Sequence, residues 1–200
     1  MSSSEILALI TGYGLAGVFV MALVEKFLPI MPSYLMLMIF GMATESIGDV
    51  MVVLVVSTVA STAASAAWYG IGDFLGDRRV RRIISKYGRF VFFSIESYER
   101  LRSAYRRNAF AVSLAGQGVP VARIYLALPA GVMRVGFRVF TLAAALGIAV
   151  YNLAFLTVGH LLRSSGQDPL TTGLVVAGVL VAVEFLILLV LRRRSRLRAA

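Results

Sequence analysis

The sequence predicts an all-α polytopic membrane protein, in which two opposed re-entrant hairpins of broken helix form inverted repeats and pack with about four transmembrane helices. Three observations carry this prediction. Of the 200 residues, 59% are hydrophobic and only 15% are charged, whereas a soluble domain is nearer half apolar and a quarter charged. Two apolar segments are each broken by proline beside a charge. The basic residues gather in two stretches, as they do at the cytoplasmic ends of membrane spans.

Besides the broken segments, the chain contains apolar stretches long enough to cross a bilayer, which takes about 20 helical residues. In chain order they are Ile6–Val24, Val50–Leu75, Phe137–Leu162 and Leu170–Leu191. No cleavable signal peptide is evident before the first stretch, so we expect it to remain as a span. The second stretch carries small residues at four-residue spacing, Ser57, Ser61 and Ser65. Such a ladder lets another helix pack closely, either within the chain or between copies in a homo-oligomer.

The basic residues predict which side of the membrane each segment faces. Ten of the twenty Lys and Arg residues lie between positions 78 and 107, and five more follow position 191. We therefore expect the connector 77–108 and the C-terminus on the cytoplasmic side. The loops Thr44–Asp49 and Ser164–Pro169, which carry no Lys or Arg, are expected outside. Topology and attraction to anionic lipids account for the net charge of +10 better than nucleic-acid binding does.

The connector also sets the expected domain organisation. It is mostly polar, but its apolar positions fit two short amphipathic helices that lie on the membrane surface. Residues 1–163 are expected to form one membrane domain that includes this connector. Residues 170–200 are expected to form a C-terminal transmembrane helix followed by a basic cytoplasmic tail.

The first broken segment, Phe27–Met42, is too short and too interrupted to be a clean span. Pro29 and Pro32 remove backbone donors and break the helix. We therefore expect a hairpin that enters from the outer face and returns to it. Its prolines either only shape the hairpin or also leave backbone N–H groups free to meet an anion.

The second broken segment, Ala109–Met133, has the same organisation. Pro120 and Pro129 interrupt it, and a short apolar run then ends at Gly131. Because arginines follow directly, we expect this hairpin to return to the cytoplasmic face. Those arginines either guide a lipid head group from the inner leaflet or simply anchor the chain at the interface; they are Arg134 and Arg138.

One charge lies beside each proline break, Glu25 in the first segment and Arg123 in the second. A charge at the bilayer centre costs about 2.5–3.5 kcal/mol on insertion scales, and opposite charges that face each other compensate part of this cost. Glu25 can gain or lose a proton, whereas Arg123 stays charged and its planar fork suits a phosphate. The residues alone leave three alternatives: a proton-sensitive phosphate site, a static buried ion pair, or a Glu25 that lies in water at the outer interface.

The sequence gives no support to enzyme chemistry. It contains no cysteine and a single histidine, His160, which leaves no thiolate or His-rich metal site. No Ser-centred nucleophile elbow and no phosphate-binding Walker loop is present. We therefore expect a protein that is not an enzyme and that uses no metal or cofactor.

The second broken segment and its continuation carry a family resemblance. Gly116–Phe140 resembles the signature of the DedA family, also called the SNARE-associated or VTT domain, whose usual form is G-R-F-x-P-x-x-R, then P-A-G, then Phe. Ala145–Asn152 resembles the family's A-x-G-x-x-x-W-N continuation, and Glu25–Ser33 is similar to its E-x-x-x-P-x-P element. Tyr87–Arg89 resembles the Y-G motif of its connector. The resemblance covers roughly residues 10 to 163.

Two positions depart from the family's pattern. Gln117 stands where the family has its first arginine, and Tyr34 stands where it has a second acidic residue. The chain thus keeps one acid and one arginine where the family often has two of each. Because both losses together leave the local charge sum unchanged, we expect the two positions to face each other.

The resemblance implies lipid transport between the leaflets of a bacterial inner membrane. DedA proteins are associated with moving undecaprenyl phosphate or phosphatidylethanolamine, in several members with dependence on the proton motive force. We expect a flippase or scramblase with undecaprenyl phosphate as the leading substrate. Its phosphate would bind Arg123 and freed backbone amides, and Glu25 would act as a proton-dependent gate. Hydrogen bonds would come from the remaining residues of the predicted site, Gln117, Tyr34 and Ser33.

Three other functions stay open at this point. The lipid could be phosphatidylethanolamine. The same cavity could serve a proton-coupled transporter of a small solute or ion. Alternatively, the chain could transport nothing and act as a membrane interaction protein that docks partners on its basic connector.

Overall fold

The computed structural model describes residues 3–28, 32–87, 95–117 and 126–163, together with Val175 and Val179. Within these ranges the regular structure is helical and contains no strand, which confirms the all-α class. The helices are α1 (Ser3–Val24), α2 (Ser33–Ala43), α3 (Ile47–Tyr87), α4 (Ile95–Arg107), α5 (Ala109–Gln117), α7 (Ala127–Val132) and α8 (Phe137–Arg163). The predicted C-terminal span 170–191 lies outside the described residues, apart from Val175 and Val179.

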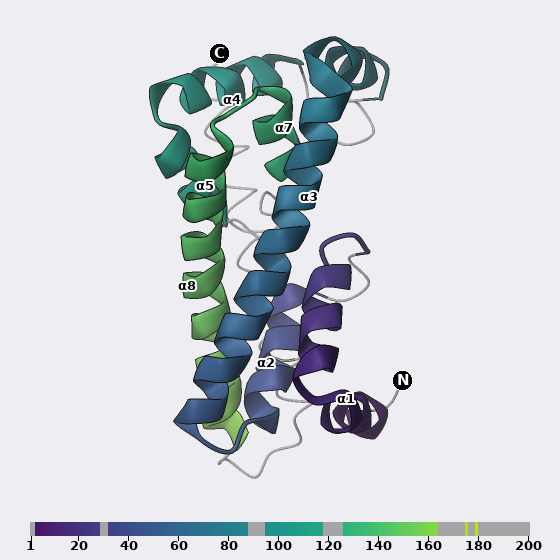
Figure 1. The fold of residues 1–200 in the computed structure, drawn as a ribbon, viewed down its shortest axis with the longest axis vertical. Helices are drawn as coiled ribbons and strands as arrows, with labels where there is room; N and C mark the ends of the chain where they lie inside the picture. The colour runs from purple at the N-terminus through teal and green to yellow at the C-terminus, as the bar shows by residue number, and fades with distance from the viewer. Residues whose placement is uncertain are drawn as a thin grey trace.

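Two long helices, α3 and α8, form the frame of the molecule and run side by side (Figure 1). In the described part of the chain, Ile47–Arg82 and Phe137–Arg163 are long and apolar enough to cross a membrane. Gly14–Val24 and Ser33–Ala43 are shorter apolar helices. The total number of transmembrane helices therefore stays a prediction.

The first predicted span is interrupted at Gly14. Its φ of 52° and ψ of −136° break α1 into two parts, in a conformation that glycine adopts readily and residues with a Cβ do not. The part after the kink, Gly14–Val24, is about 16 Å long at the usual rise of an α-helix, roughly half the thickness of a hydrocarbon core. This part alone is too short to span a bilayer.

Each long helix holds one helix of each half of the molecule. Helices α1 and α7 pack on α3, while α2 and α5 pack on α8. In Figure 1, α1 and α2 lie together toward one end of the frame, and α4, α5 and α7 lie at the other. The described part of the first broken segment, Phe27–Met42, contains one helix, α2, whose partner in the pair is the predicted span α1. That the two broken segments re-enter the membrane face from which they came remains a prediction.

The packing of α2 on α8 depends on two glycines, one on each helix, and each lies against the backbone of the other helix. Gly41 of α2 lies against the backbone carbonyl of Leu156, and Gly159 of α8 lies against the backbone carbonyl of Met38. A Cβ at either glycine would collide with that carbonyl oxygen. Small residues of this kind let two helix backbones approach closely inside a membrane.

The packing of α7 on α3 repeats the arrangement at the other end. Gly72 of α3 lies against the carbonyl of Leu128, and Gly131 of α7 lies against the carbonyl of Tyr69. A Cβ would again collide with the oxygen in both cases. Gly131, which the sequence analysis assigned to shaping the hairpin, thus also brings α7 into direct contact with α3.

Polar and apolar residues are distributed on α3 and α8 as in a lipid-exposed bundle. The serine ladder of α3 points inward, with Ser57, Ser61 and Ser65 all at most 3% exposed. Large apolar side chains point outward, among them Val52, Val55, Val59, Leu142, Leu146 and Val150. A soluble protein rarely exposes such a continuous apolar surface. This distribution agrees with a membrane protein.

The two helix pairs have separate hydrophobic cores. Around α1 and α2, the core includes Val18, Ala22, Phe40, Leu54 and Leu156. Around α7, it includes Tyr69, Ala127, Phe140, Ala144 and Ile148. The frame helices α3 and α8 contribute to both cores, so they join the two halves.

The connector begins inside α3 and continues as α4. Helix α3 extends past the predicted start of the connector, with a kink at Gly76 where φ is 69°. Beyond the kink, Asp77 accepts a hydrogen bond from Tyr98 at 2.7 Å and one from Arg81 at 2.9 Å. Burial raises the pKa of Asp77, but these hydrogen bonds and the nearby guanidinium groups outweigh burial and lower it overall. The carboxylate therefore links the end of α3 to α4.

Candidate functional site

The turn that follows α1 brings together two residues of the predicted site. Glu25, directly after α1, is 7% exposed, and Ser33, the first residue of α2, is 8% exposed. The Ser33 hydroxyl donates a hydrogen bond of 2.5 Å to Glu25 Oε1. Pro32 precedes Ser33 with φ of −59° and starts α2 without an N–H of its own. The proline break thus turns the chain so that the serine reaches the buried acid.

The second oxygen of the Glu25 carboxyl is also buried. Within the described ranges, Oε2 has no hydrogen-bond partner. A buried carboxyl oxygen without a donor is costly unless a proton, water or another donor satisfies it. A second donor to Oε2 would therefore complete the hydrogen bonding of this carboxyl group.

Sequence reasoning missed Lys26, the neighbour of Glu25. Its side chain is only 1% exposed, and its backbone carbonyl accepts a hydrogen bond of 3.0 Å from the indole of Trp68. Phe27 stacks on the same indole, with ring centroids 5.6 Å apart. Because Trp68 lies near the middle of α3, these contacts fix the turn at mid-frame. A lysine inside an apolar segment was the signal that could have identified it.

Gln117 ends α5 at a comparable depth. It is 1% exposed, and its side chain lies against Gly147 near the middle of α8, where a Cβ would come within 2.7 Å of the glutamine Cβ. Its Oε1 has no hydrogen-bond partner among the described residues. Gly147, which belongs to the motif in the sequence, therefore provides the space that a buried glutamine needs.

Tyr34 and Gln117 pack on different parts of α8. The ring of Tyr34 lies 5.9 Å from that of Phe155, centroid to centroid. Phe155 is eight residues beyond Gly147, which is about 12 Å along an α-helix. That the two positions face each other remains a prediction.

The remaining predicted residues fall in three places. Arg123, Pro29 and Pro120 lie outside the described residues. Pro129 lies in the first turn of α7, where the missing N–H is tolerated. Arg134 and Arg138 are exposed at the start of α8. Arg134 has a φ of 50° and forms an ion pair of 2.9 Å with Asp73, which ties the α7–α8 turn to α3.

A buried amide lies between the two frame helices. Asn152 of α8 is 1% exposed and donates a hydrogen bond of 3.2 Å from Nδ2 to the hydroxyl of Ser57 on α3. Its Oδ1 has no hydrogen-bond partner in the described part of the chain. In the described residues, the same holds for one side-chain carbonyl or carboxyl oxygen of each of Glu25, Gln117 and Asn152. Each of these oxygens could accept a hydrogen bond from a water or another donor inside the apolar bundle.

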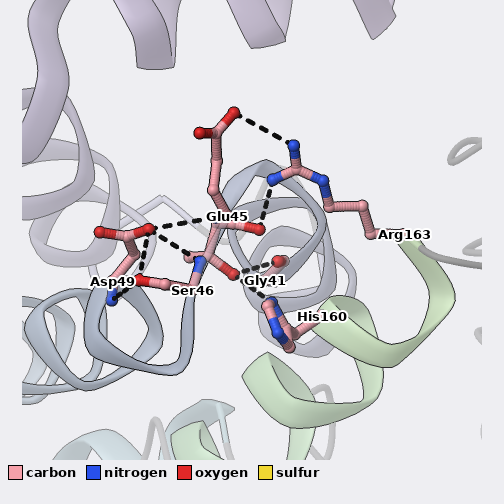
Figure 2. A network of polar contacts seen from close by, with 7 residues as sticks. Gly41, Glu45, Ser46, Asp49, His160 and Arg163 are labelled. Carbon is pink, nitrogen blue, oxygen red and sulfur yellow. Dashed lines mark hydrogen bonds and ion pairs between the residues drawn. The ribbon is translucent and has the colours of Figure 1, made fainter.

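A polar network, shown in Figure 2, joins the C-terminal end of α2 to the C-terminal end of α8. The Thr44 hydroxyl donates its one proton to the carbonyl of Gly41 at 2.6 Å. His160 Nδ1 lies 2.8 Å from that hydroxyl, so the ring nitrogen must be the donor, which assigns the tautomer. Arg163 donates to the carbonyl of Thr44 and pairs with Glu45 at 3.1 Å. His160 therefore helps to hold the C-terminal ends of α2 and α8 together.

The same loop also holds an acid that caps α3. Asp49 accepts hydrogen bonds from the hydroxyl and the backbone N–H of Ser46, both at 2.9 Å. The Ser46 hydroxyl is the main cause that lowers the pKa of Asp49. Across the described ranges, no group of three or more His, Cys, Asp or Glu residues is arranged to hold a metal ion.

Comparison with known proteins identifies the family. The VTT domain matches residues 28–161. Undecaprenyl phosphate transporter A of Staphylococcus aureus is 26% identical over 157 residues, which cover 78% of this chain and 77% of the relative. The protein of the same name from Bacillus subtilis is 26% identical over 192 residues, covering 92% and 93%. An alkaline phosphatase-like protein of Lactococcus lactis subsp. cremoris is 21% identical over 164 residues, covering 81% and 77%. No solved structure matches the chain significantly.

Because the domain match spans most of the sequence, the chain belongs to the VTT domain family, also called DedA.

Proposed function

We propose that this protein carries a phosphate-bearing lipid, with undecaprenyl phosphate as the leading substrate, between the leaflets of a bacterial inner membrane. The observation that carries the proposal is the buried Glu25–Ser33 pair at a helix break, in a chain whose relatives include two proteins named undecaprenyl phosphate transporter A. An ionisable side chain inside a membrane bundle is expensive and usually functional. Proton linkage through Glu25 is part of this proposal.

The lipid phosphate would bind at mid-frame, beside Glu25 and Gln117. Arg123 would supply a bidentate cation, and backbone amides freed by proline would add donors. Lys26 brings a second positive side chain to the same depth, since it is buried next to Glu25. Ser33, Tyr34 and Gln117 would complete the polar lining.

Orientation and assembly are also proposals. The basic connector and the C-terminal tail would lie in the cytoplasm, and the loop with Glu45 and Asp49 would lie outside, as the distribution of basic residues predicts. Protons and a membrane lipid would be the partners, without nucleic acid. The inward direction of the serine ladder favours its use within the chain, so a homo-oligomer would need another surface.

Leaflet-to-leaflet transfer in proteoliposomes tests the proposal. Labelled undecaprenyl phosphate and labelled phosphatidylethanolamine would be compared, with and without a pH gradient. We expect transfer of the polyprenyl lipid that depends on the gradient and is lost in E25Q and in R123A. The exposed residues Glu45 and Arg100 provide the matched controls E45Q and R100A, which should retain transfer.

Other outcomes would favour the alternatives. Transfer of phosphatidylethanolamine alone would change the substrate but keep the mechanism. A proton or ion flux without lipid transfer, by folded protein, would contradict the lipid proposal and favour a small-solute transporter. Cellular activity that survives loss of Glu25 and Arg123 but not of the connector would favour a non-transporting interaction protein.

A further inference from the structure

A cavity lies at the basic end of the molecule, away from the helix breaks. Its volume is about 290 Å³, near the lower end of the roughly 300–1,000 Å³ typical of ligand pockets. One wall consists of Arg102, Tyr105 and Arg106 from α4, and the other of Met133, Val135 and Gly136 from the turn between α7 and α8. This size suits a small polar group better than a whole lipid.

Two arginines give the cavity a positive wall. Arg102 and Arg106 are four residues apart on α4, so they project from the same face of the helix. Arg102 lies 3.7 Å from Asp77, whose carboxylate is already closer to Arg81. Among the described residues, Arg106 forms no ion pair. At least one guanidinium at this wall is therefore available to an anion.

Tyr105 completes the α4 wall of the cavity with its ring. Only 5% of the residue is exposed, and its hydroxyl oxygen is inaccessible and lies beside the buried Ser113 hydroxyl rather than in the cavity. The polar contacts of a ligand would therefore come from the two arginines.

The backbone at the opposite wall also favours an anion. Helix α8 begins at Phe137, directly after the cavity residue Gly136, and its first recorded backbone bond runs from the Phe140 N–H to the Gly136 carbonyl. The N–H groups before Phe140 have no carbonyl partner within the helix, and the helix dipole makes this end positive. Positive side chains and a positive helix end thus lie on opposite sides of one cavity.

Apolar side chains in the wall distinguish a lipid from a free anion. Met133 and Val135 line the cavity together with the ring of Tyr105. An amphiphile places its charged head against the arginines and its chains against such side chains, whereas inorganic phosphate gains nothing from them.

We infer that this cavity binds the phosphate head group of an anionic membrane lipid, with Arg102 and Arg106 as charged donors. The site is separate from the mid-frame site around Glu25. Its occupation does not require that any lipid crosses the membrane, so it can be tested independently of transport.

Binding of a short-chain phosphatidic acid to the purified full-length protein in detergent tests the inference. Dioctanoyl phosphatidylcholine and inorganic phosphate serve as comparison ligands at equal ionic strength. We expect saturable binding of phosphatidic acid, and weaker binding of both comparison ligands. The double variant R102Q/R106Q and the single variant R106Q should each bind phosphatidic acid at least about ten-fold more weakly, because hydrogen bonds to charged groups are the strong ones.

The matched control removes the same charge from α4 outside the cavity. Arg100 and Arg107 are exposed and do not line it, so R100Q/R107Q should bind within about two-fold of the unmodified protein. Y105F should also bind within about two-fold of the unmodified protein, because the removed hydroxyl does not face the cavity. E25Q should bind normally, which separates this site from the proposed transport site.

Three results would overturn the inference. Equal losses in R102Q/R106Q and R100Q/R107Q would mean that binding reflects general positive charge. Inorganic phosphate that binds as tightly as phosphatidic acid would make the ligand a free anion rather than a lipid. Absence of saturable binding by protein with an unchanged unfolding temperature would exclude the site altogether.

Discussion

The α1–α2 pair and the α5–α7 pair attach to the same frame in the same way. Each pair rests one helix on α3 and one on α8, and each includes a contact in which two glycines face carbonyl oxygens of the opposing helix. Their inner ends differ. The first presents a buried acid held by a serine hydroxyl, and the second a buried glutamine whose oxygen lacks a described donor. The packing is repeated while the chemistry is not, which indicates that the two halves have different tasks.

The largest expected effect concerns the shared packing. G41A and G131A would each force a Cβ into a backbone carbonyl, so we expect each to lower the free energy of unfolding by about 1–3 kcal/mol. Thermal unfolding in detergent measures this as a lower midpoint. G70A is the matched control, because nothing lies within 4 Å of a Cβ at Gly70. A loss in one variant only would show that the two halves are not held alike.

The next effect concerns the acid of the first pair. S33A leaves Glu25 Oε1 without its described donor, so we expect destabilisation of about 1–3 kcal/mol and reduced lipid transfer. A double-mutant cycle with E25Q isolates the contact, and the coupling should exceed about 0.5 kcal/mol. S103A, at an exposed position of α4, should change neither property. Additive effects of S33A and E25Q would argue against a functional contact.

Substitution of Gln117 in the second pair should not destabilise the protein, in contrast to substitution of Ser33 in the first. Q117M replaces a buried group that lacks a described partner by an apolar side chain of similar length. We therefore expect stability to stay within about 1 kcal/mol of the unmodified protein, or to rise. Lipid transfer should nevertheless fall several-fold if Gln117 lines the path. Unchanged transfer at unchanged stability would restrict the working site to the first pair.

The smallest expected effect compares the acids at the two ends. The pKa values of Asp77 and Asp49 are both lowered, so each carboxylate stabilises the fold above its ordinary pKa, and this stability is lost as pH falls through the folded value. We expect D77N to remove more of the acid-dependent stability than D49N, because Asp77 joins α3 to α4. Unfolding midpoints measured from about pH 7 down to about pH 3 would show this. Equal behaviour of the two variants would contradict the expected difference.

Much of the frame could be predicted from the sequence, because its signals are local. The spans Val50–Leu75 and Phe137–Leu162 fall within α3 and α8, and the connector was expected to be helical, as α4 is. Hydrophobic length and charge placement alone are enough for such predictions. The kink at Gly14 could not be foreseen, since glycine within an apolar run is common in straight membrane helices as well.

The candidate site was predictable only in part. Glu25 and Ser33 were both proposed, and a short hydrogen bond joins them. Lys26 was overlooked, and the fixing of its turn by Trp68 joins residues 42 positions apart. The glycine contacts between α2 and α8 are likewise long-range. A single sequence gives the small residue but not the carbonyl that it will meet.

The division of both helix pairs between α3 and α8 has a mechanical consequence. Helices α1 and α7 belong to one half of the frame, and α2 and α5 to the other. A sliding of α3 along α8 would therefore separate α1 from α2 and α5 from α7 at the same moment, so neither pair could open alone. The hydrogen bonds from Asn152 Nδ2 to the hydroxyls of Ser57 and Thr58, 3.2 Å and 3.5 Å long, cross that sliding surface and would have to break before it could move.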